Sequence, residues 1–395
     1  MKVLLVSDYG NLAGGAEYQL QLLRDGLRQR GHDVRLLATT ARPGGGPSIA
    51  DDECLGTTSS LRTMLQSFNP SAFLTLRRVL AEFRPEVVHV TLFLTQLSPA
   101  ILPLLRGTPS LFYAVWSRPV CPRGTRMLRD GTLCRTVWGT GCFRTRCVPL
   151  RDWPPLMLQR TLWQRWRGVF DRIVANSAAT ERQLREAGIE VAEVIWPGVP
   201  RLPLSRPFSV EPTVAFAGRL VREKGVDVLL SAFADVAKRL PAARLVLVGD
   251  GPDRSVLEKQ VRDLGIAERV DVTGRLSPEE TQGRLAGAWI QAVPSRWPEP
   301  FGMVATEAMM RGAAVVASDI GGLPEIVEHG RTGLLVPPGD ARAFAAALLR
   351  LLQDREEADR MGHEGRALAV AKFGIEAHVD RFVETYRAVC SGRAS

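Results

Sequence analysis

Short apolar runs alternate with longer amphipathic segments along most of the chain, and this alternation constrains the fold more than any other feature of the sequence. The first run, Val3–Ser7, is followed by a glycine-rich turn, a helical pattern over Glu17–Arg30 and a second run at Val34–Ala38. Short, continuously apolar strands are typical of a parallel sheet that helices cover on both faces. The same pattern predicts further strands at 87–91, 111–115, 172–175 and 193–196.

A proline-rich segment from Trp196 to Pro212 interrupts the alternation and is interpreted as a linker. After it the pattern restarts, and a helical region follows from Ala341 to about Arg387. The predicted strands of this second half lie at 213–217, 244–248, 269–273, 290–293 and 314–317. The sequence therefore predicts an α/β protein with two doubly wound, Rossmann-like domains that face each other across a cleft, residues 1–200 and 201–373.

The composition is that of a globular protein, because 45% of the 395 residues are apolar and 24% are charged. A disordered chain and a disulfide-stapled miniprotein are thereby excluded. No segment has the pattern of a signal peptide or a membrane span, so we expect a cytoplasmic protein. The formal net charge of +9 is concentrated between Arg118 and Arg167, where eleven arginines accompany two acids, Asp130 and Asp152. We therefore expect the partner of this segment to be anionic.

Two glutamates, Glu299 and Glu307, are separated by seven residues within the segment Pro294–Met309. Glu299 precedes a turn into a helix, whose first backbone N–H groups are free to donate hydrogen bonds; the residues concerned are Phe301, Gly302 and Met303. Buried carboxylates can accept paired hydrogen bonds from vicinal hydroxyls, so the two glutamates suit a sugar ring and a ribose. Taken singly, each of them is more often a solvated surface acid.

A basic loop follows the predicted strand 213–217 directly, in the order Gly218-Arg219-Leu220-Val221-Arg222-Glu223-Lys224-Gly225. Arginine binds phosphate through two parallel hydrogen bonds and lysine supplies a point charge, so Arg219 and Lys224 predict a diphosphate site. The alternative is a solvated basic loop. Glycine-containing loops after the later strands could also approach a nucleotide closely, at Gly249–Pro252, Gly274-Arg275-Leu276 and Ser318–Glu325.

The first predicted helix opens with Gly14 and Gly15, which could receive a phosphate or a hydroxyl group at the helix N-terminus. A tight turn between strand and helix explains them equally well. The loop is not a GxGxxG fingerprint, so a dinucleotide site is not supported.

Together, these elements resemble the retaining family-4 glycosyltransferases, also called glycosyl transferase group 1, which have the GT-B fold. The resemblance extends over the whole chain and is densest from about 213 to 340. It rests on the GRL-x3-KG element at Gly218–Gly225, the glutamate pair, the run Gly321–Asp340, and the N-terminal elements Gly14–Glu17 and Arg30–Val34.

The resemblance implies transfer of a hexose-type sugar from a nucleotide diphosphate sugar, with UDP, GDP or another base, to a hydroxyl acceptor, with retention and without a metal. It implies an acceptor-binding first domain, onto which a C-terminal helix at about 374–390 packs back, and a donor-binding second domain. Arg219 and Lys224 would bind the diphosphate, Glu299 the sugar hydroxyls and Glu307 the ribose. The other donor-binding residues would be Gly14, Gly15, Gly218, Arg275, Leu276, Phe301, Gly302, Met303 and Val304.

One element departs from the family pattern. Relatives with a Cys-Pro-x-Gly element, here Cys121–Gly124, usually carry a His-Asp pair six residues ahead of the cysteine, where this chain has Val115 and Trp116. His89 is the nearest substitute, although a lone histidine at a strand end is more often structural.

Other functions predict other sequence features. A nucleotide-sugar epimerase of the same fold would lack an acceptor, and a phosphorylase would need a cofactor lysine site that is not recognisable here. A nucleic-acid-binding protein predicts aromatic residues interleaved with cations across an exposed sheet. In this chain five of the eight tryptophans instead fall between Trp116 and Trp166.

That same segment, 116–167, contains four of the six cysteines, Cys121, Cys134, Cys142 and Cys147. They predict a structural Zn²⁺ site, or else free or paired thiols. The stretch Trp153–Arg167 is basic and amphipathic, so it could rest on the inner face of a membrane beside a lipid-linked acceptor. Packing into the core of the first domain is the favoured alternative.

Overall fold

The structure of the protein, a computed structural model, describes residues 1–136, 138–204 and 208–394, which divide into two units. Unit 1 combines Met1–Gly198 with the C-terminal segment that begins at Ile375, and unit 2 comprises Val199–Gly374. Residues 205–207 of the predicted linker lie outside the described residues, and its described part belongs to no helix or strand of either unit.

Unit 1 is built on a seven-stranded sheet in the order β3-β2-β1-β4-β5-β6-β7, and every neighbouring pair is parallel. Leu4 and Val6 of β1 pack into one apolar cluster, while Val3 and Leu5 pack into another. Since successive side chains of a strand point to opposite faces, both faces of the sheet are covered. The strands are β1 (Lys2–Tyr9), β2 (Asp33–Thr39), β3 (Asp52–Cys54), β4 (Val87–Thr91), β5 (Ser110–Ala114), β6 (Arg172–Ala175) and β7 (Glu193–Val194).

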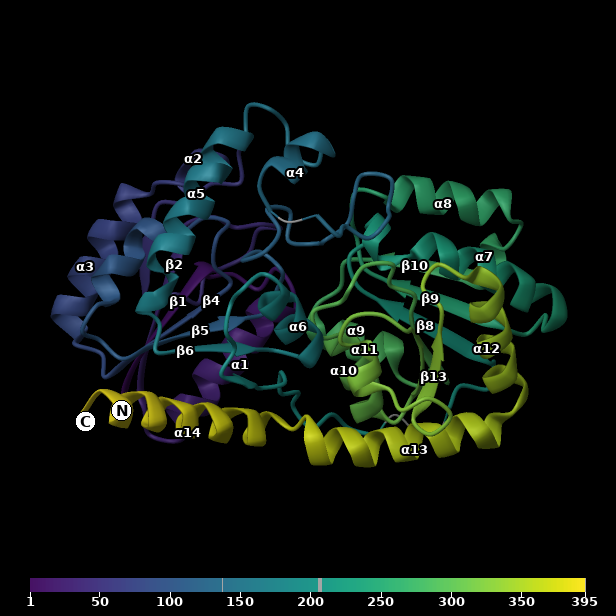
Figure 1. Ribbon diagram of the computed structural model, residues 1–395. Helices are drawn as coiled ribbons and strands as arrows, with labels where there is room; N and C mark the ends of the chain where they lie inside the picture. The colour runs from purple at the N-terminus through teal and green to yellow at the C-terminus, as the bar shows by residue number, and fades with distance from the viewer. Residues whose placement is uncertain (137, 205–207, 395) are drawn as a thin grey trace. The chain divides into compact units, whose positions relative to one another are not determined.

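Helices and short 3₁₀ turns connect these strands (Figure 1). They are α1 (Gly15–Gln29), α2 (Arg62–Leu65), α3 (Pro70–Phe83), η1 (Pro99–Leu105), α4 (Thr140–Arg144), α5 (Trp153–Trp166), η2 (Arg167–Val169) and α6 (Ala178–Glu186). The last helix of the chain, α14 (Ile375–Ala394), also belongs to unit 1. The strands predicted from the apolar runs are confirmed, with ends that differ by one or two residues. Strand β3 was missed because the sequence Asp-Glu-Cys contains no apolar run.

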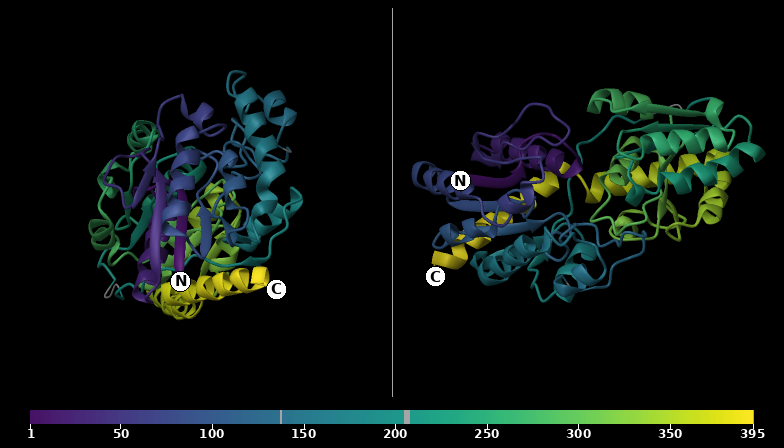
Figure 2. Two further views of the ribbon diagram at one scale, coloured as in Figure 1. Left: turned by 90° about the vertical axis from the view of Figure 1, so that its left-hand side faces the viewer. Right: turned by 90° about the horizontal axis from the view of Figure 1, so that it is seen from above.

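Helix α14 completes the core of unit 1, although it lies at the end of the chain. It contacts α1, and Val379, Phe382 and Tyr386 are buried in the same cluster as Val3 and Leu5. Figures 1 and 2 show it as the yellow helix that runs past the N-terminus.

His89 lies in the middle of β4 beneath this helix. Its Nδ1 is 2.7 Å from the hydroxyl of Tyr386, and burial lowers the pKa of the imidazole to about 3. The hypothesis that His89 takes the place of the missing histidine is therefore wrong. His89 is a neutral core residue that anchors α14.

Helix α5 packs its apolar face into unit 1. Trp163 is 1% exposed, and its ring centroid lies 5.3 Å from that of Phe112 on β5. The amide of Gln159 donates to the backbone oxygens of Gln66 and Leu94. These contacts favour the core interpretation of the basic helix over the membrane-resting one. Within the described ranges, no helix has the length and apolar character needed to cross a bilayer.

Unit 2 is built on a six-stranded parallel sheet in the order β10-β9-β8-β11-β12-β13. The strands are β8 (Thr213–Ala217), β9 (Arg244–Val248), β10 (Val270–Gly274), β11 (Ile290–Val293), β12 (Ala314–Ser318) and β13 (Gly333–Val336). The first five confirm the sequence prediction, and β13 was not recognised as a strand.

The helices of unit 2 lie on both faces of its sheet, as the two views of Figure 2 and Figure 1 show. They are η3 (Arg222–Lys224), α7 (Val226–Arg239), α8 (Arg254–Asp263), η4 (Ala267–Arg269), α9 (Pro278–Leu285), α10 (Met303–Arg311), α11 (Leu323–Ile326), α12 (Ala341–Gln353) and α13 (Arg355–Lys372). The C-terminal helical region is thus three helices, divided at Asp354, whose side chain caps α13, and at Phe373-Gly374.

Candidate functional site

The strand order of unit 2 reverses between β8 and β11, which are neighbours in the sheet although they are separated along the chain. In open α/β sheets, ligands bind at the carboxyl ends of the strands at such a reversal. The loop after β8 contains Arg219 and Lys224, and the loop after β11 contains Glu299. The fold therefore brings the two strongest sequence motifs to the place where a ligand site is expected.

Backbone contacts hold these two loops against each other. Gly225 has φ +67°, and a Cβ built on it would lie 2.0 Å from the backbone oxygen of Pro294, so only glycine fits. The N–H of Arg296 donates to the oxygen of Glu223 at 2.9 Å, and the Arg296 guanidinium is 2.7 Å from Asp227. The approach of the loops is therefore set by the backbone as well as by the charged side chains.

Lys224 and Glu299 form an ion pair across the junction. The Lys224 Nζ lies 2.6 Å from Glu299 Oε1, which also accepts a hydrogen bond from the Ser295 hydroxyl at 2.6 Å. Burial alone would raise the pKa of Glu299, but the Lys224 ammonium and the Ser295 hydroxyl hold it below its ordinary value. The site thus presents an ionised carboxylate next to a cation that is 22% exposed.

The loop after β12 supports Glu299 from its backbone side. The Gly322 N–H donates to the Glu299 oxygen at 2.8 Å. Gly321 has φ +62°, and a Cβ on it would lie 2.3 Å from that same oxygen. Gly321 and Gly322 therefore hold the backbone of Glu299 in place. A fixed backbone helps to keep the Glu299 side chain against Lys224.

Helix α10 begins at Met303, directly after this turn, with Gly302 as its N-cap at φ +121°. Phe301 is buried, whereas Gly302, Met303 and Val304 are partly exposed. The first N–H groups of a helix lack intrahelical carbonyl partners and favour a negatively charged ligand. These residues thus bring backbone N–H groups to the end of the loop that contains Glu299.

Glu307 lies one helical turn from Arg311 on α10, and the two side chains interact electrostatically. Burial raises the pKa of Glu307, and the Arg311 charge opposes this rise. Arg311 is 3% exposed, and burial lowers its pKa to about 10. Its guanidinium donates to Gln282 at 2.9 Å and to Gln291 at 3.2 Å. Hydrogen bonds to α9 and β11 therefore hold the Arg311 guanidinium in place, so that it is a fixed cation beside the half-buried Glu307.

Glu307 is predicted to accept ribose hydroxyls as an anion, and its raised pKa brings its protonation closer to neutral pH. On that prediction, we expect nucleotide binding to weaken as the pH falls. In Arg311→Met the opposing charge is lost, so the weakening should begin at higher pH. Calorimetric titration with UDP and GDP between about pH 8 and about pH 5 measures this. Arg342→Met, an exposed arginine of α12, is the control. Identical pH profiles for Arg311→Met and the control would contradict the expected role.

The remaining residues that were predicted to bind the sugar donor follow other strands of the unit 2 sheet or belong to unit 1. Gly218 directly follows β8, and Arg219 is exposed, without an ion pair to any described side chain. Arg275 and Leu276 follow β10 at the far edge of the same sheet. Gly14 and Gly15 open α1 of unit 1. Their role as donor-binding residues stays a prediction.

Unit 1 has its own strand-order reversal, between β1 and β4. There the buried carboxylate of Asp8 accepts hydrogen bonds from the backbone N–H groups of Thr95, Gln96 and Leu97 at 2.7–2.9 Å. Burial raises the pKa of Asp8 to about 6, against the lowering effect of these donors. Asp8 thus fixes the loop that follows β4. Trp116, in the loop after β5, is only partly exposed, and its indole nitrogen is buried without a partner in the described parts of the chain.

The predicted zinc site does not gain support from the structure. All six cysteines have free thiols, and among the residues that the structure describes no group of three or more His, Cys, Asp or Glu side chains is arranged to hold a metal ion. Burial is the main cause of a raised pKa at Cys142, with smaller contributions from the nearby Cys121, Cys134 and Cys147. The four thiols therefore lie in one region.

Three further residues belong to the site although the sequence analysis did not single them out. Ser295 hydrogen-bonds Glu299, the Trp297 ring lies 5.7 Å from the Lys224 Nζ, and Arg311 supports Glu307. Ser295 and Trp297 lie inside the segment Pro294–Met309, and Arg311 lies four residues beyond Glu307, so helical spacing was an available signal.

Comparison with known proteins agrees with this arrangement. The family model described as glycosyltransferase family 4 matches residues 13–201, and the one described as glycosyl transferases group 1 matches residues 205–368. The alpha-D-kanosaminyltransferase of Streptomyces kanamyceticus is 35% identical over 178 residues, which are 45% of this chain and 46% of that protein.

The GDP-mannose-dependent alpha-(1-6)-phosphatidylinositol monomannoside mannosyltransferase of Mycobacterium tuberculosis is 38% identical over 168 residues, 41% of this chain and 44% of that protein. The chain thus spans about half the length of these curated relatives. Among solved structures, the sucrose-phosphate synthase of Thermosynechococcus elongatus has a TM-score of 0.77 at 24% identity, and covers 99% of both chains. That likeness shows the two-sheet fold.

Proposed function

This chain belongs to the family-4 glycosyltransferases, and we propose that it transfers a hexose-type sugar from a nucleotide diphosphate sugar to a hydroxyl acceptor, with retention of the anomeric configuration. The observation that carries the proposal is the Lys224–Glu299 pair at the strand-order reversal of unit 2. It offers a cation to a diphosphate and, next to it, an ionised carboxylate to sugar hydroxyls. The M. tuberculosis relative, which is named as GDP-mannose-dependent, supports a nucleotide-sugar donor.

Unit 2 holds the donor in this proposal. Arg219 and Lys224 bind the diphosphate, and Glu299 with the helix start at Phe301–Val304 holds the sugar hydroxyls. Glu307, supported by Arg311, accepts the ribose hydroxyls. The glycine loops at Gly218 and at Arg275-Leu276 lie against the nucleotide, and Gly14 and Gly15 of unit 1 approach the donor phosphate.

The proposed mechanism depends on the positive charges of Arg219 and Lys224 at the diphosphate. As the bond from the anomeric carbon to the diphosphate breaks, the electron pair leaves with the phosphate oxygen, and the sugar becomes oxocarbenium-like. Arg219 and Lys224 neutralise the developing negative charge and are already in position, which is the main source of rate enhancement in such sites. The acceptor hydroxyl attacks from the face on which the diphosphate departs, and its proton passes to the leaving phosphate oxygen. The two basic side chains supply the positive charge, so the proposal needs no divalent cation.

Unit 1 holds the acceptor in this proposal. Its segment between Arg118 and Arg167 contains the whole net positive charge of the chain. The M. tuberculosis relative is named for a phosphatidylinositol monomannoside acceptor, a phosphate-bearing lipid. Both observations support an anionic or lipid-linked acceptor, used in the cytoplasm at the inner face of the membrane. No role for nucleic acid is proposed.

A transfer assay distinguishes this function from its alternatives. The full chain is incubated with UDP-glucose or GDP-mannose, with and without octyl glucoside and myo-inositol phosphate, and the products are identified by mass spectrometry and by the anomeric NMR signal. An α-linked product from an α-linked donor is the expected result. A β-linked product would contradict retention. Donor converted to its epimer without acceptor would indicate an epimerase, and phosphate-dependent release of sugar phosphate a phosphorylase.

A further inference from the structure

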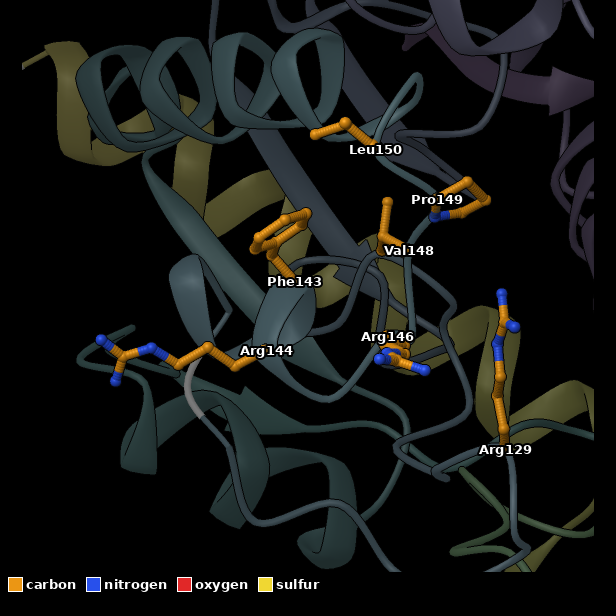
Figure 3. A pocket seen from close by; sticks show the side chains of 7 residues that line it. All are labelled: Arg129, Phe143, Arg144, Arg146, Val148, Pro149 and Leu150. Atoms are coloured by element: carbon orange, nitrogen blue, oxygen red, sulfur yellow. The ribbon is translucent and has the colours of Figure 1, made fainter.

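The arginines between Arg118 and Arg167 differ in their surroundings. Three of them, Arg129, Arg144 and Arg146, line a cavity of about 440 Å³. Figure 3 shows the Arg144 side chain extending away from the other lining residues, so these charges do not converge on one point. Arg118 is 6% exposed, whereas the other described arginines of the segment are exposed or only partly buried. A buried guanidinium requires an explanation, because burying a charge is costly unless it is paired.

Arg118 is held in place but forms no ion pair with any residue that the structure describes. Its Nη2 donates to Gln66 Oε1 at 3.0 Å, and a Cβ built on Gly124 would lie 3.3 Å from its Cδ, so both ends of the side chain are positioned. Gln66 is neutral and uses only one of the five N–H groups that a guanidinium carries. Nε and Nη1 have no partner in the described parts of the chain and are not sealed from solvent, unlike the Nε of Arg24 and of Arg311. The guanidinium therefore keeps donor groups for a ligand.

The buried carboxylate of Asp8 does not provide the missing partner. Asp8 attracts Arg118 electrostatically, but the two side chains form no ion pair. The Asp8 oxygens instead accept hydrogen bonds from the loop after β4, namely from the backbone N–H groups of Thr95, Gln96 and Leu97. Asp8 therefore fixes its own loop and leaves the donor groups of Arg118 unused.

Two further groups near Arg118 are also available to an anion. Burial lowers the pKa of Arg118 to about 10; Asp8 and Tyr9 oppose this electrostatically, and the like charge of Arg62 adds to it. The Arg62 side chain is exposed and forms no ion pair within the described ranges, and the Tyr9 hydroxyl makes no hydrogen bond there. Two arginines that repel each other, neither in an ion pair, favour an anionic ligand, and the hydroxyl offers it one more hydrogen bond.

These groups lie at the edge of the unit 1 sheet where a ligand is expected. Tyr9 ends β1 and Arg118 follows β5, so both belong to the carboxyl ends of parallel strands, and β1 borders the strand-order reversal. We propose that Arg118, together with Arg62 and the Tyr9 hydroxyl, binds a phosphomonoester group of the acceptor. Such a group carries a charge of about −1.5 to −2 at pH 7, which matches two cations better than the single charge of a carboxylate or a phosphodiester does.

This inference rests on the proposed function and names the acceptor class, and a binding experiment tests it separately from activity. Full-length protein is first saturated with UDP, which occupies the proposed diphosphate site of unit 2. It is then titrated calorimetrically with glycerol 3-phosphate, a monoester, and with glycerophosphocholine, a diester. Arg118→Met removes the charge and keeps an apolar stem, and Tyr9→Phe removes only the hydroxyl. The matched control is Arg165→Met, an exposed arginine of the same segment that does not act on the charge of Arg118.

Glycerol 3-phosphate should bind at least about tenfold more weakly to Arg118→Met than to the control, and about threefold more weakly to Tyr9→Phe. The wild type should bind glycerophosphocholine at least about tenfold more weakly than the monoester. Equal binding of the two phosphates by the wild type, or equal monoester affinity of Arg118→Met and the control, would overturn the inference.

Thermal unfolding separates binding from a structural role. Arg118 has no ion-pair partner to leave unpaired, so Arg118→Met should unfold within about 5 °C of the control, and a fall of more than about 10 °C would show a structural arginine instead. Tyr9→Phe keeps the backbone and the ring, so unchanged monoester affinity in this variant would also contradict the proposed site. UDP affinity of every variant reports on unit 2, so a failed donor site and a failed phosphate site give different results.

Discussion

Replacing Lys224 by alanine is expected to lower the rate of sugar transfer by about a thousandfold, which makes it one of the two most damaging single changes in the site. Lys224 is the cation closest to Glu299, with 2.6 Å between Nζ and Oε1. In the proposed reaction it neutralises the departing diphosphate, so its loss raises the barrier and also weakens binding of the nucleoside diphosphate.

The same replacement leaves the buried carboxylate of Glu299 without its cation. The pKa of Glu299 should then rise, because burial is the largest influence on it and the Lys224 charge no longer opposes it. Lys238→Ala is the control, since Lys238 is exposed and, among the residues that the structure describes, forms an ion pair with Asp235 alone, on the same helix. Steady-state transfer rates, with UDP and GDP affinities measured by calorimetry, test the prediction. Less than about tenfold loss in a folded Lys224→Ala protein would show that this lysine does not act on the leaving group.

Replacing Glu299 by glutamine is expected to lower transfer by about a hundredfold or more, while affinity for the free nucleoside diphosphate stays nearly unchanged. Glu299 is 4% exposed, and its carboxylate accepts hydrogen bonds from Lys224 and Ser295. Glutamine keeps the shape of the side chain but loses the charge that, in the proposed donor site, holds the sugar hydroxyls. Lys224 remains available to the diphosphate, so the defect should appear in transfer and in binding of the intact donor sugar.

A stability measurement separates the chemical role of Glu299 from a structural one. Its pKa is lowered in the folded protein, so its ionised form stabilises the fold at pH values above the ordinary glutamate pKa, and this contribution is lost as the pH falls through the lowered value. Glu299→Gln should therefore lower the free energy of unfolding by about 2 kcal/mol at neutral pH. Glu223→Gln, in the same loop as Lys224 but only half-buried, is the matched control for both measurements. If the two variants lose activity equally, the assignment of Glu299 to the donor sugar is wrong.

Much of the fold could be predicted from the sequence because it depends on neighbouring residues. The apolar runs at Val87–Thr91 and Thr213–Ala217 appear as β4 and β8 with the predicted bounds. Strand β3 carries no such run, and it forms because it pairs with β2. Its position could not be found from local pattern alone.

The candidate site could also be predicted only in part from the sequence. The types and spacing of Arg219, Lys224 and Glu299 predicted a place for phosphate and sugar, and their motif carried the family resemblance. The direct contact between Lys224 and Glu299, 75 residues apart, arises only when β8 and β11 become neighbours. Helical spacing placed Arg311 next to Glu307, but only the folded structure shows that Arg311 is buried there.

His89 is the clearest case in which the tertiary structure decided the role. From the sequence it was the nearest substitute for the missing His-Asp pair, whereas in the fold it is covered by α14, whose Tyr386 lies 297 residues further along the chain. The sequence by itself determined the two α/β halves, the residue types of the site and the place of the excess charge, because periodicity, composition and motif spacing are properties of adjacent residues. The tertiary structure decided which charges pair, which are buried and which remain available to a ligand, because ionisation and solvation depend on groups that only folding brings together.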